Sequence, residues 1–278
     1  MGTTTLQPPR RWPAGPIHVE LPPGGGPALA GQGHSSQAQA LKCLILVPAF
    51  NESQSVGKLV RRLNRLLPGY DVLVIDDGST DDTVRQVPPG TAVVSLPFNL
   101  GIGGAMQTGY RYADLNRYDV AVQVDGDGQH RPSEVCNLVA ALQSTGADLV
   151  LGSRFLARKN FKQSLTRMTG IRVLSTWIRI LCGLKITDCT SGFRAVNRRV
   201  IQAYAHWYPE DYPEPEVVLL LHRSKFKVVE IPARMRRRMY GKSSISLARG
   251  LFYVLKVGIC LALDTIRQPW PSGKIDGL

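Results

Sequence analysis

Two carboxylates stand one residue apart, with small residues around them, at the end of an apolar run. Residues 122–124 form the run, and Asp125 and Asp127 follow it. Carboxylate, amide and water oxygens suit hard cations such as Mg²⁺ or Mn²⁺, which bind through one or two carboxylates together with substrate phosphates. The spacing indicates either a metal-diphosphate site or a solvated Asp-Gly turn, since such turns are common.

The surrounding elements alternate between short apolar strands and helices. The pattern predicts helices at 53–67, 104–113 and 133–143, and strands at 41–47, 72–75, 91–96, 120–124, 148–151 and 227–231. This order indicates an α/β fold with a mostly parallel sheet covered by helices on both faces. Open sheets of this kind bind ligands at the carboxyl ends of their strands, which favours the metal-diphosphate interpretation.

Acidic residues also follow the first two predicted strands. Glu52 comes after the first strand, and Asp76 and Asp77 come directly after the second. A nucleotide could meet Asp76 or Asp77 with its base or ribose while Asp125 and Asp127 hold a metal on its diphosphate. Each acid alone could be a helix cap, but their recurrence at strand ends favours a nucleotide site.

Composition separates the chain into three parts. Residues 1–40 are rich in Pro, Gly, Gln and Ser and lack apolar periodicity, which predicts a disordered tail without a secretory signal. Residues 41–244 form the expected catalytic domain, and residues 245–278 an amphipathic segment. The chain carries a net charge of +13, almost all of it outside the tail. Such a charge suits nucleic acid, an anionic membrane surface or phosphorylated substrates.

The last apolar stretch, residues 245–266, is interrupted by Arg249, Lys256 and Asp264. Its uninterrupted run at 257–263 is too short for a membrane span of ~20 residues. Arg249 and Lys256 are seven residues apart and share one helical face. The segment is therefore expected to be an amphipathic helix that lies on a membrane, or a helix that packs on the domain.

Four motifs stand in order along the chain, at residues 47–52, 74–81, 99–103 and 125–130. In this order they resemble the family 2 glycosyltransferases, which have the Rossmann-like GT-A fold, and the resemblance covers residues 42–245. Residues 188–194 and 238–244 resemble later motifs of one group within that family, the polyprenyl-phosphate sugar synthases of the dolichyl-phosphate mannose synthase group. Residues 212–216 resemble a bacterial branch of this group, some members of which use N-acetylhexosamine donors and a small membrane partner.

The resemblance implies an inverting, metal-dependent hexosyltransferase. Its donor would be a UDP- or GDP-linked sugar, and its acceptor a polyprenyl phosphate, which is already ionised and needs positioning rather than a base. The metal, Mg²⁺ or Mn²⁺, would be held by Asp125, Asp127 and Gln129. The nucleotide would contact a larger set of residues, namely Pro48, Phe50, Glu52, Asp76, Asp77, Gly103 and Asp125.

Three arginines match motif arginines that contact the diphosphate or the acceptor phosphate: Arg154, Arg194 and Arg238. Arginine suits such bidentate contacts better than lysine. Two positions depart from the family pattern, because Gly128 stands where many members have Leu and Ile102 where many have Lys. Both departures concern the donor pocket.

The pair of spanning helices that some members carry at the C-terminus is not expected in this sequence. Membrane contact would then depend on the basic surface, on the 245–266 helix or on a small membrane protein. The expected location is cytoplasmic, peripheral on the cytoplasmic face of a membrane.

Two other functions stay open. A saccharide hydroxyl as acceptor would need a general base, which Asp211 could supply. A non-catalytic protein could instead use the basic surface to bind acidic lipid or nucleic acid. The interleaved aromatic residues of a nucleic-acid stacking surface are not evident, so a nucleic-acid partner is not expected.

Overall fold

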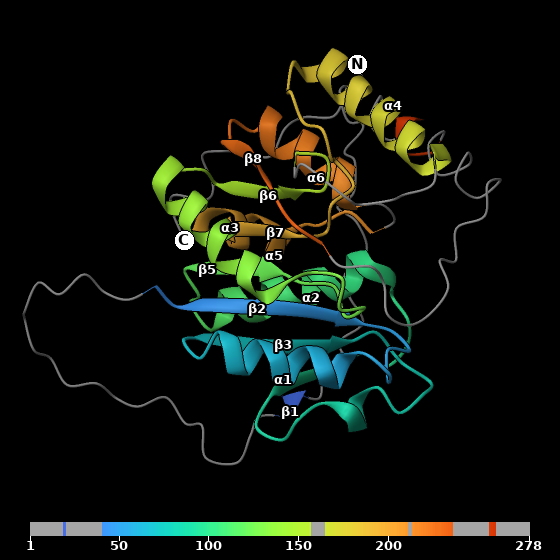
Figure 1. The fold of residues 1–278 in the computed structure, drawn as a ribbon, viewed down its shortest axis with the longest axis vertical. Coiled ribbons are helices and arrows are strands. Elements are labelled where there is room, and N and C mark those ends of the chain that lie inside the picture. Colours follow the sequence, from blue (N-terminus) through green and yellow to red (C-terminus); the bar gives the residue numbers. More distant parts are fainter. Residues whose placement is uncertain (1–18, 21–40, 157–164, 211–212, 236–255, 260–278) are drawn as a thin grey trace, which may run out of the picture.

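The structure, a computed structural model, describes residues 19–20, 41–156, 165–210, 213–235 and 256–259 (Figure 1). In these residues a single mixed sheet of eight strands has the order β1-β4-β3-β2-β5-β7-β6-β8. The strands are β1 (Val19–Glu20), β2 (Cys43–Ala49), β3 (Tyr70–Asp76), β4 (Ala92–Ser95), β5 (Val120–Gln123), β6 (Leu149–Ser153), β7 (Arg194–Asn197) and β8 (Val228–Pro232).

The central strands place the functional motifs at one edge of the sheet. Strands β4, β3, β2 and β5 are parallel neighbours, whereas β7 runs antiparallel to both β5 and β6. Ala49 at the end of β2 pairs with Asp76 at the end of β3, and Leu46 pairs with Gln123 at the end of β5. The loops that follow β2, β3 and β5 therefore begin side by side.

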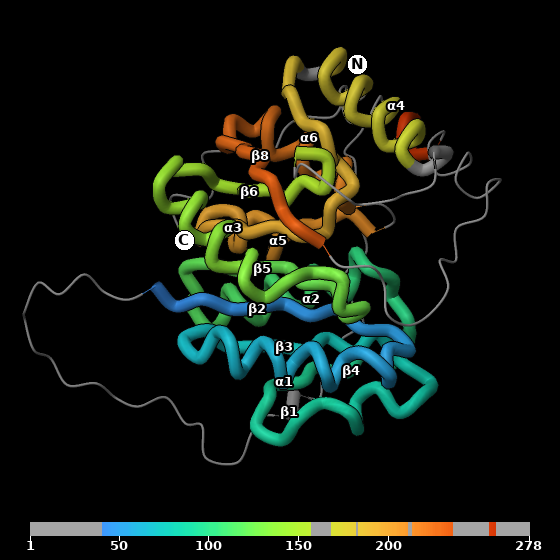
Figure 2. Tube along the Cα trace, in the orientation of Figure 1, coloured from blue at the N-terminus to red at the C-terminus, as the bar shows by residue number. Residues whose placement is uncertain are grey.

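Helices cover both faces of the sheet, as the parallel arrangement requires (Figure 2). On one face, α1 (Val56–Leu66) and α3 (Pro132–Thr145) pack against alternate strand residues such as Ile45. The opposite face, which includes Leu46, packs against α2 (Gly101–Leu115), α4 (Leu165–Cys182), α5 (Arg198–His206) and α6 (Pro213–Arg223). A short 3-10 helix, η1 (Val84–Gln86), follows β3.

The predicted α/β fold with a mostly parallel sheet is confirmed, and each strand and helix predicted between residues 41 and 231 has a counterpart. Beyond residue 40, the elements that were not predicted are η1, α4, β7, α5 and α6. Within the predicted disordered tail, Val19 and Glu20 instead pair with β4 as an antiparallel strand. The rest of the tail and most of the 245–278 segment lie outside the described residues.

Among the residues that the structure describes, no helix combines the length and the apolar character needed to cross a membrane.

Candidate active site

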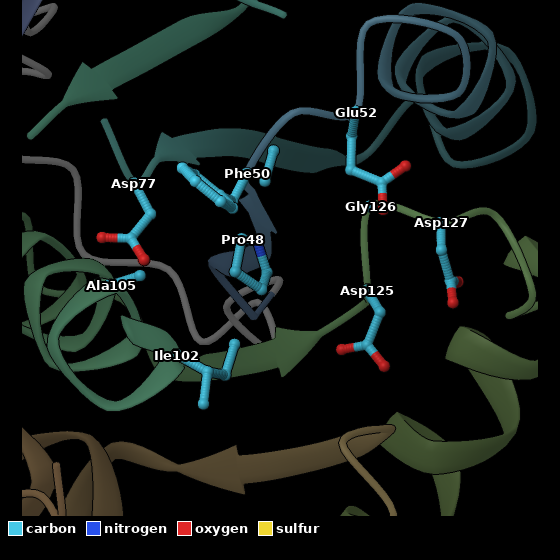
Figure 3. A pocket seen from close by; sticks show the side chains of 10 residues that line it. Pro48, Phe50, Glu52, Asp77, Ile102, Ala105, Asp125, Gly126 and Asp127 are labelled. Atoms are coloured by element: carbon cyan, nitrogen blue, oxygen red, sulfur yellow. The ribbon is translucent and has the colours of Figure 1, made fainter. Parts of the chain in front are cut away.

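A cavity of about 270 Å³ lies where β2, β3 and β5 end (Figure 3). Its acidic residues come from three different loops, and Figure 3 shows Asp77 at one end of the cavity and Asp125 and Asp127 at the other. The remaining wall is mainly apolar. The full lining is Pro48, Ala49, Phe50, Glu52, Asp77, Ile102, Ala105, Asp125, Gly126 and Asp127.

The turn after β5 holds the two aspartates by hydrogen bonds on both sides. The backbone N–H of Asp125 donates to Nδ1 of His130 at 3.1 Å, and Nε2 of Gln123 donates to Oδ1 of Asp125 at 3.2 Å. The backbone N–H of Gln129 donates to Oδ1 of Asp127 at 3.0 Å. Both carboxylates are thereby oriented by their own segment while they face the cavity.

The donor set fits a hard divalent cation that also takes oxygens from a substrate. The side chain of Asp125 is 39% exposed, so its carboxylate is open to a ligand. The described residues contain no cluster of three or more His, Cys, Asp or Glu that could hold a metal by themselves. Two carboxylates completed by phosphate and water oxygens match the coordination that Mg²⁺ prefers. Gln129, predicted as a third ligand, is not among the residues that line the cavity.

The nucleoside end of the cavity combines an exposed aromatic ring with a buried acid. Phe50 is 45% exposed, and Asp77 is 4% exposed. Oδ1 of Asp77 accepts the backbone N–H of Leu100 at 2.7 Å. Burial raises the pKa of Asp77, against the lowering effect of backbone hydrogen bonds from Leu100 and Gly101. A ring for stacking and a carboxylate for N–H or O–H groups are suitable partners for a nucleoside.

Asp76 occupies a different place from its neighbour. Its Oδ1 accepts the backbone N–H of Ser79 at 3.2 Å, and it is buried without lining the cavity. Of the two predicted acids, the structure brings Asp77 to the cavity and uses Asp76 in the turn after β3.

The loop after β2 is fixed to the loop after β3, and this positions Phe50 and Glu52. Asn51 has a left-handed φ of 54°, which Asn tolerates better than most residues, and its Oδ1 accepts the backbone N–H of Thr80 at 2.9 Å. The backbone N–H of Glu52 donates to Oγ1 of Thr83 at 2.8 Å. The carboxylate of Glu52 accepts Oγ of Ser55 at 2.5 Å, so the start of α1 also orients this acid.

Gly103 was predicted to contact the nucleotide, but in the structure it packs against the backbone of residues 209–210. A Cβ on Gly103 would lie 2.2 Å from the carbonyl oxygen of Glu210 and 2.3 Å from that of Pro209. The residues of α2 that line the cavity are instead Ile102 and Ala105. Gly103 therefore allows the 209–210 backbone to lie directly on α2.

We expect Gly103→Ala to destabilise the fold by about 1–3 kcal/mol, because the added methyl group must displace backbone rather than a mobile side chain. Urea unfolding measures this change. Gly69→Ala is the matched control, since a Cβ at Gly69 would meet nothing within 4 Å. A Gly103→Ala protein with unchanged stability and a raised donor KM would instead favour the predicted nucleotide contact.

Arg154 is engaged by a buried acid rather than left free for a phosphate. Its Nε and Nη2 each donate to a carboxylate oxygen of Asp188 at 2.6 Å, and Nη2 also donates to Oγ1 of Thr190 at 2.9 Å. The side chains are 8% and 0% exposed. Burial alone would lower the pKa of Arg154, but the hydrogen bonds and charge of Asp188 raise it. Arg154 does not line the cavity, and its phosphate contact stays a prediction.

Arg194 is also buried, with no exposed surface. Its Nη2 donates to the carbonyl oxygen of Ser191 at 2.6 Å, and it adds positive charge beside Tyr204, Tyr208 and Glu214. It does not line the cavity either, and its phosphate contact likewise stays a prediction. Arg238 and Asp211 lie outside the described residues.

His130 and Gly192 touch Asp125 and were not predicted as site residues. His130 accepts the backbone N–H of Asp125, and a Cβ on Gly192 would lie 2.9 Å from Oδ1 of Asp125. The position of His130 within the aspartate motif was a usable signal. Gly192 lies in the motif at residues 188–194, but its distance in sequence from the aspartates gave no sign that it packs against Asp125.

Comparisons with known proteins agree with this geometry. The family description "Glycosyl transferase family 2" matches residues 44–205. The polyprenol monophosphomannose synthase of Mycolicibacterium smegmatis is 29% identical over 252 residues, which are 86% of this chain and 95% of that protein. The undecaprenyl-phosphate mannosyltransferase of Micrococcus luteus is 31% identical over 216 residues, which are 74% of this chain and 88% of that protein.

A solved structure supports the fold assignment. Glucosyl-3-phosphoglycerate synthase of Mycobacterium tuberculosis, in complex with Mn²⁺, UDP-glucose and phosphoglyceric acid, aligns with a TM-score of 0.62 at 20% identity. The alignment covers 81% of this chain and 80% of that one. At this identity the likeness shows the shared GT-A-like fold, with its mixed sheet flanked by helices.

Proposed function

The chain belongs to glycosyl transferase family 2, and from this premise we propose that it moves a sugar from a UDP- or GDP-linked donor to a polyprenyl phosphate. One observation carries the proposal of a nucleotide-sugar donor. Phe50 and Asp77 lie at one end of the same cavity that holds Asp125 and Asp127 at its other end. An aromatic ring and a buried acid suit a nucleoside, and paired carboxylates suit the metal-bound diphosphate.

The proposed reaction is a direct displacement with inversion. An oxygen of the acceptor phosphate forms a bond to the anomeric carbon while the bond to the diphosphate oxygen breaks and its electron pair leaves with the nucleotide. A Mg²⁺ or Mn²⁺ ion held by Asp125 and Asp127 would neutralise the charge that develops on the leaving diphosphate. The carboxylates act by holding charge in place and transfer no proton, because the acceptor is already an anion.

The acceptor half of the proposal draws on the relatives. The two relatives are named as a polyprenol monophosphomannose synthase and an undecaprenyl-phosphate mannosyltransferase. The chain's net charge of +13 favours a phosphorylated acceptor and an anionic membrane surface. Because Arg154 is paired with Asp188 and Arg194 is buried, we propose Arg238 as the motif arginine that binds the acceptor phosphate.

The proposed acceptor carries a long apolar chain, so the enzyme would act at a membrane surface. We place it at the cytoplasmic face, where nucleotide sugars are found, as a peripheral protein. Its basic surface, the 245–266 segment or a small membrane protein would provide the contact.

A saccharide hydroxyl is the second candidate acceptor, and one contact favours it. The backbone of Glu210 lies on Gly103, next to Ile102 in the cavity wall, so the residue before Asp211 is close to the donor site. Asp211 would then act as general base. Asp211→Asn should abolish transfer to a saccharide hydroxyl. It should leave the rate of transfer to a polyprenyl phosphate unchanged.

A donor screen tests the proposal. The full chain is incubated with a polyprenyl phosphate, Mg²⁺ or Mn²⁺, and UDP- or GDP-linked hexoses and N-acetylhexosamines in turn, and the released nucleoside diphosphate is measured. We expect one donor to give release that depends on the polyprenyl phosphate. Release that is equal with and without this acceptor, for every donor, would count against the proposal.

Removal of divalent cations should stop the transfer. We expect EDTA to reduce nucleotide release to the level without enzyme, and excess Mg²⁺ or Mn²⁺ to restore it. Without a cation, the negative charge on the leaving diphosphate is repelled by the carboxylates of Asp125 and Asp127 and is not neutralised. Full activity after dialysis against EDTA would show that the aspartates serve another purpose.

A further inference from the structure

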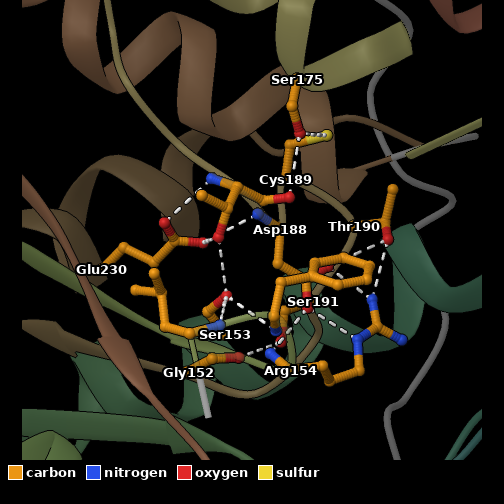
Figure 4. Close-up of polar contacts among 12 residues, drawn as sticks. Gly152, Ser153, Arg154, Ser175, Asp188, Cys189, Thr190, Ser191 and Glu230 are labelled. Carbon is orange, nitrogen blue, oxygen red and sulfur yellow. Dashed lines mark hydrogen bonds and ion pairs between the residues drawn. The ribbon is translucent and has the colours of Figure 1, made fainter. Parts of the chain in front are cut away.

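The loop at residues 187–192, which we call the bracing loop, connects the end of β6 with the aspartate turn. At its start it is held by Glu230 of β8. The backbone N–H groups of Thr187 and Asp188 donate to the Glu230 carboxylate at 2.9 and 2.8 Å, and Oγ1 of Thr187 donates to it at 2.9 Å (Figure 4). One acid thus satisfies three donors of the bracing loop.

The middle of the bracing loop is fixed to the end of β6. Asp188 receives the two hydrogen bonds of Arg154, and Oγ of Ser191 donates to the carbonyl oxygen of Gly152 at 2.7 Å. Both Asp188 and Ser191 are almost fully buried. Hydrogen bonds to charged groups in a buried setting hold geometry firmly. The bracing loop is therefore tied down along its length by groups outside the cavity.

The far end of the bracing loop touches the Asp125 carboxylate. A Cβ on Gly192 would lie 2.9 Å from Oδ1 of Asp125, 3.1 Å from Oδ2, and 2.9 Å from Nε2 of Gln123. No larger residue fits there unless Asp125 or Gln123 moves. Gln123 also donates from Nε2 to Oδ1 of Asp125, and His130 accepts the backbone N–H of Asp125. The carboxylate is confined between the turn that carries it and the Cα of Gly192.

We propose that the bracing loop sets the orientation of the Asp125 carboxylate toward the cation, with Gly192 and Glu230 as positioning residues. The inference rests on the proposed function insofar as it takes Asp125 as a cation ligand. It also gives Arg154 a role: through Asp188 it holds the bracing loop, and it need not touch the substrate.

The test measures Mn²⁺ binding by electron paramagnetic resonance, with saturating UDP or GDP and without any sugar donor. We expect Gly192→Ala to weaken Mn²⁺ binding by about 10-fold, because the added methyl group displaces the Asp125 carboxylate and changes in the surroundings of a metal ligand typically have effects of this size. Glu230→Gln, which keeps the shape but removes the charge, should weaken it in the same direction. Gly69→Ala is the matched control and should bind Mn²⁺ like the wild-type chain. Thermal unfolding of each variant reports the folded fraction.

Folded Gly192→Ala protein with wild-type Mn²⁺ affinity would overturn the proposal, as would absence of Mn²⁺ binding by the wild-type chain. If Gly192→Ala does not fold, Glu230→Gln decides by the same criterion. Because no turnover is measured, failure here differs from failure of the proposed function, in which the wild-type chain binds Mn²⁺ and nucleotide but transfers no sugar to a polyprenyl phosphate.

Discussion

Asp127→Asn should lower the rate of sugar transfer by about 10²–10³-fold, the usual cost of removing one preorganised group that stabilises transition-state charge. The substitution keeps the shape of the side chain and the oxygen that accepts the backbone N–H of Gln129, but it removes the negative charge. The rate is measured with a saturating donor and excess Mn²⁺. Because Asp127 is only partly buried at the cavity, we expect the unfolding midpoint to change little.

Asp82→Asn is the control for loss of one negative charge outside the cavity. Asp82 is exposed and pairs with exposed Arg85 on the loop after β3. It should keep the wild-type rate and metal requirement. Asp127→Asn with an unchanged rate and unchanged metal dependence would contradict the assignment of the cavity as the catalytic site.

Asp188→Asn should destabilise the fold by about 3–5 kcal/mol, because it leaves the charge of Arg154 buried without its counterion. The two side chains are 0% and 8% exposed, and Asp188 accepts two 2.6 Å hydrogen bonds from Arg154. Equilibrium unfolding in urea measures the loss. Asp82→Asn again serves as the control, because its pair is surface-exposed and such pairs contribute little.

The double variant Arg154→Met with Asp188→Leu separates charge burial from packing. Replacing both partners by apolar groups of similar size should cost much less than the single substitution. If the single and double variants lost the same stability, the buried charge would not be the cause. If Asp188→Asn lost none, the ion pair would not hold the bracing loop.

The fold could be predicted because its signals are local. Apolar runs closed by Pro48 or by acidic residues marked β2, β3 and β5, and their parallel pairing brought Glu52, Asp77 and Asp125 to one edge. Strand β7 was missed for a physical reason. It has only four residues, and it begins with an arginine that is fully buried, so the apolar pattern that marks a buried strand is interrupted.

The same limit applies to the site. The acids of the cavity could be predicted from their positions at strand ends, and the family resemblance added Pro48 and Phe50. Motif spacing could not show that Arg154 is paired with Asp188, since the two are 34 positions apart and meet only when β6 and the bracing loop come together. Nor could spacing separate a glycine that cradles a phosphate from Gly103, which makes room for the 209–210 backbone. Both distinctions depend on tertiary contacts.

The central claim is tested most directly by the fate of the transferred sugar. The full chain, a radiolabelled nucleotide sugar, Mn²⁺ and a polyprenyl phosphate are incubated together, and the product is partitioned between chloroform–methanol and water. We expect the label in the organic phase with the wild-type chain and almost none with Asp127→Asn. A water-soluble, acid-stable labelled product would contradict the account and would favour a saccharide hydroxyl as the acceptor.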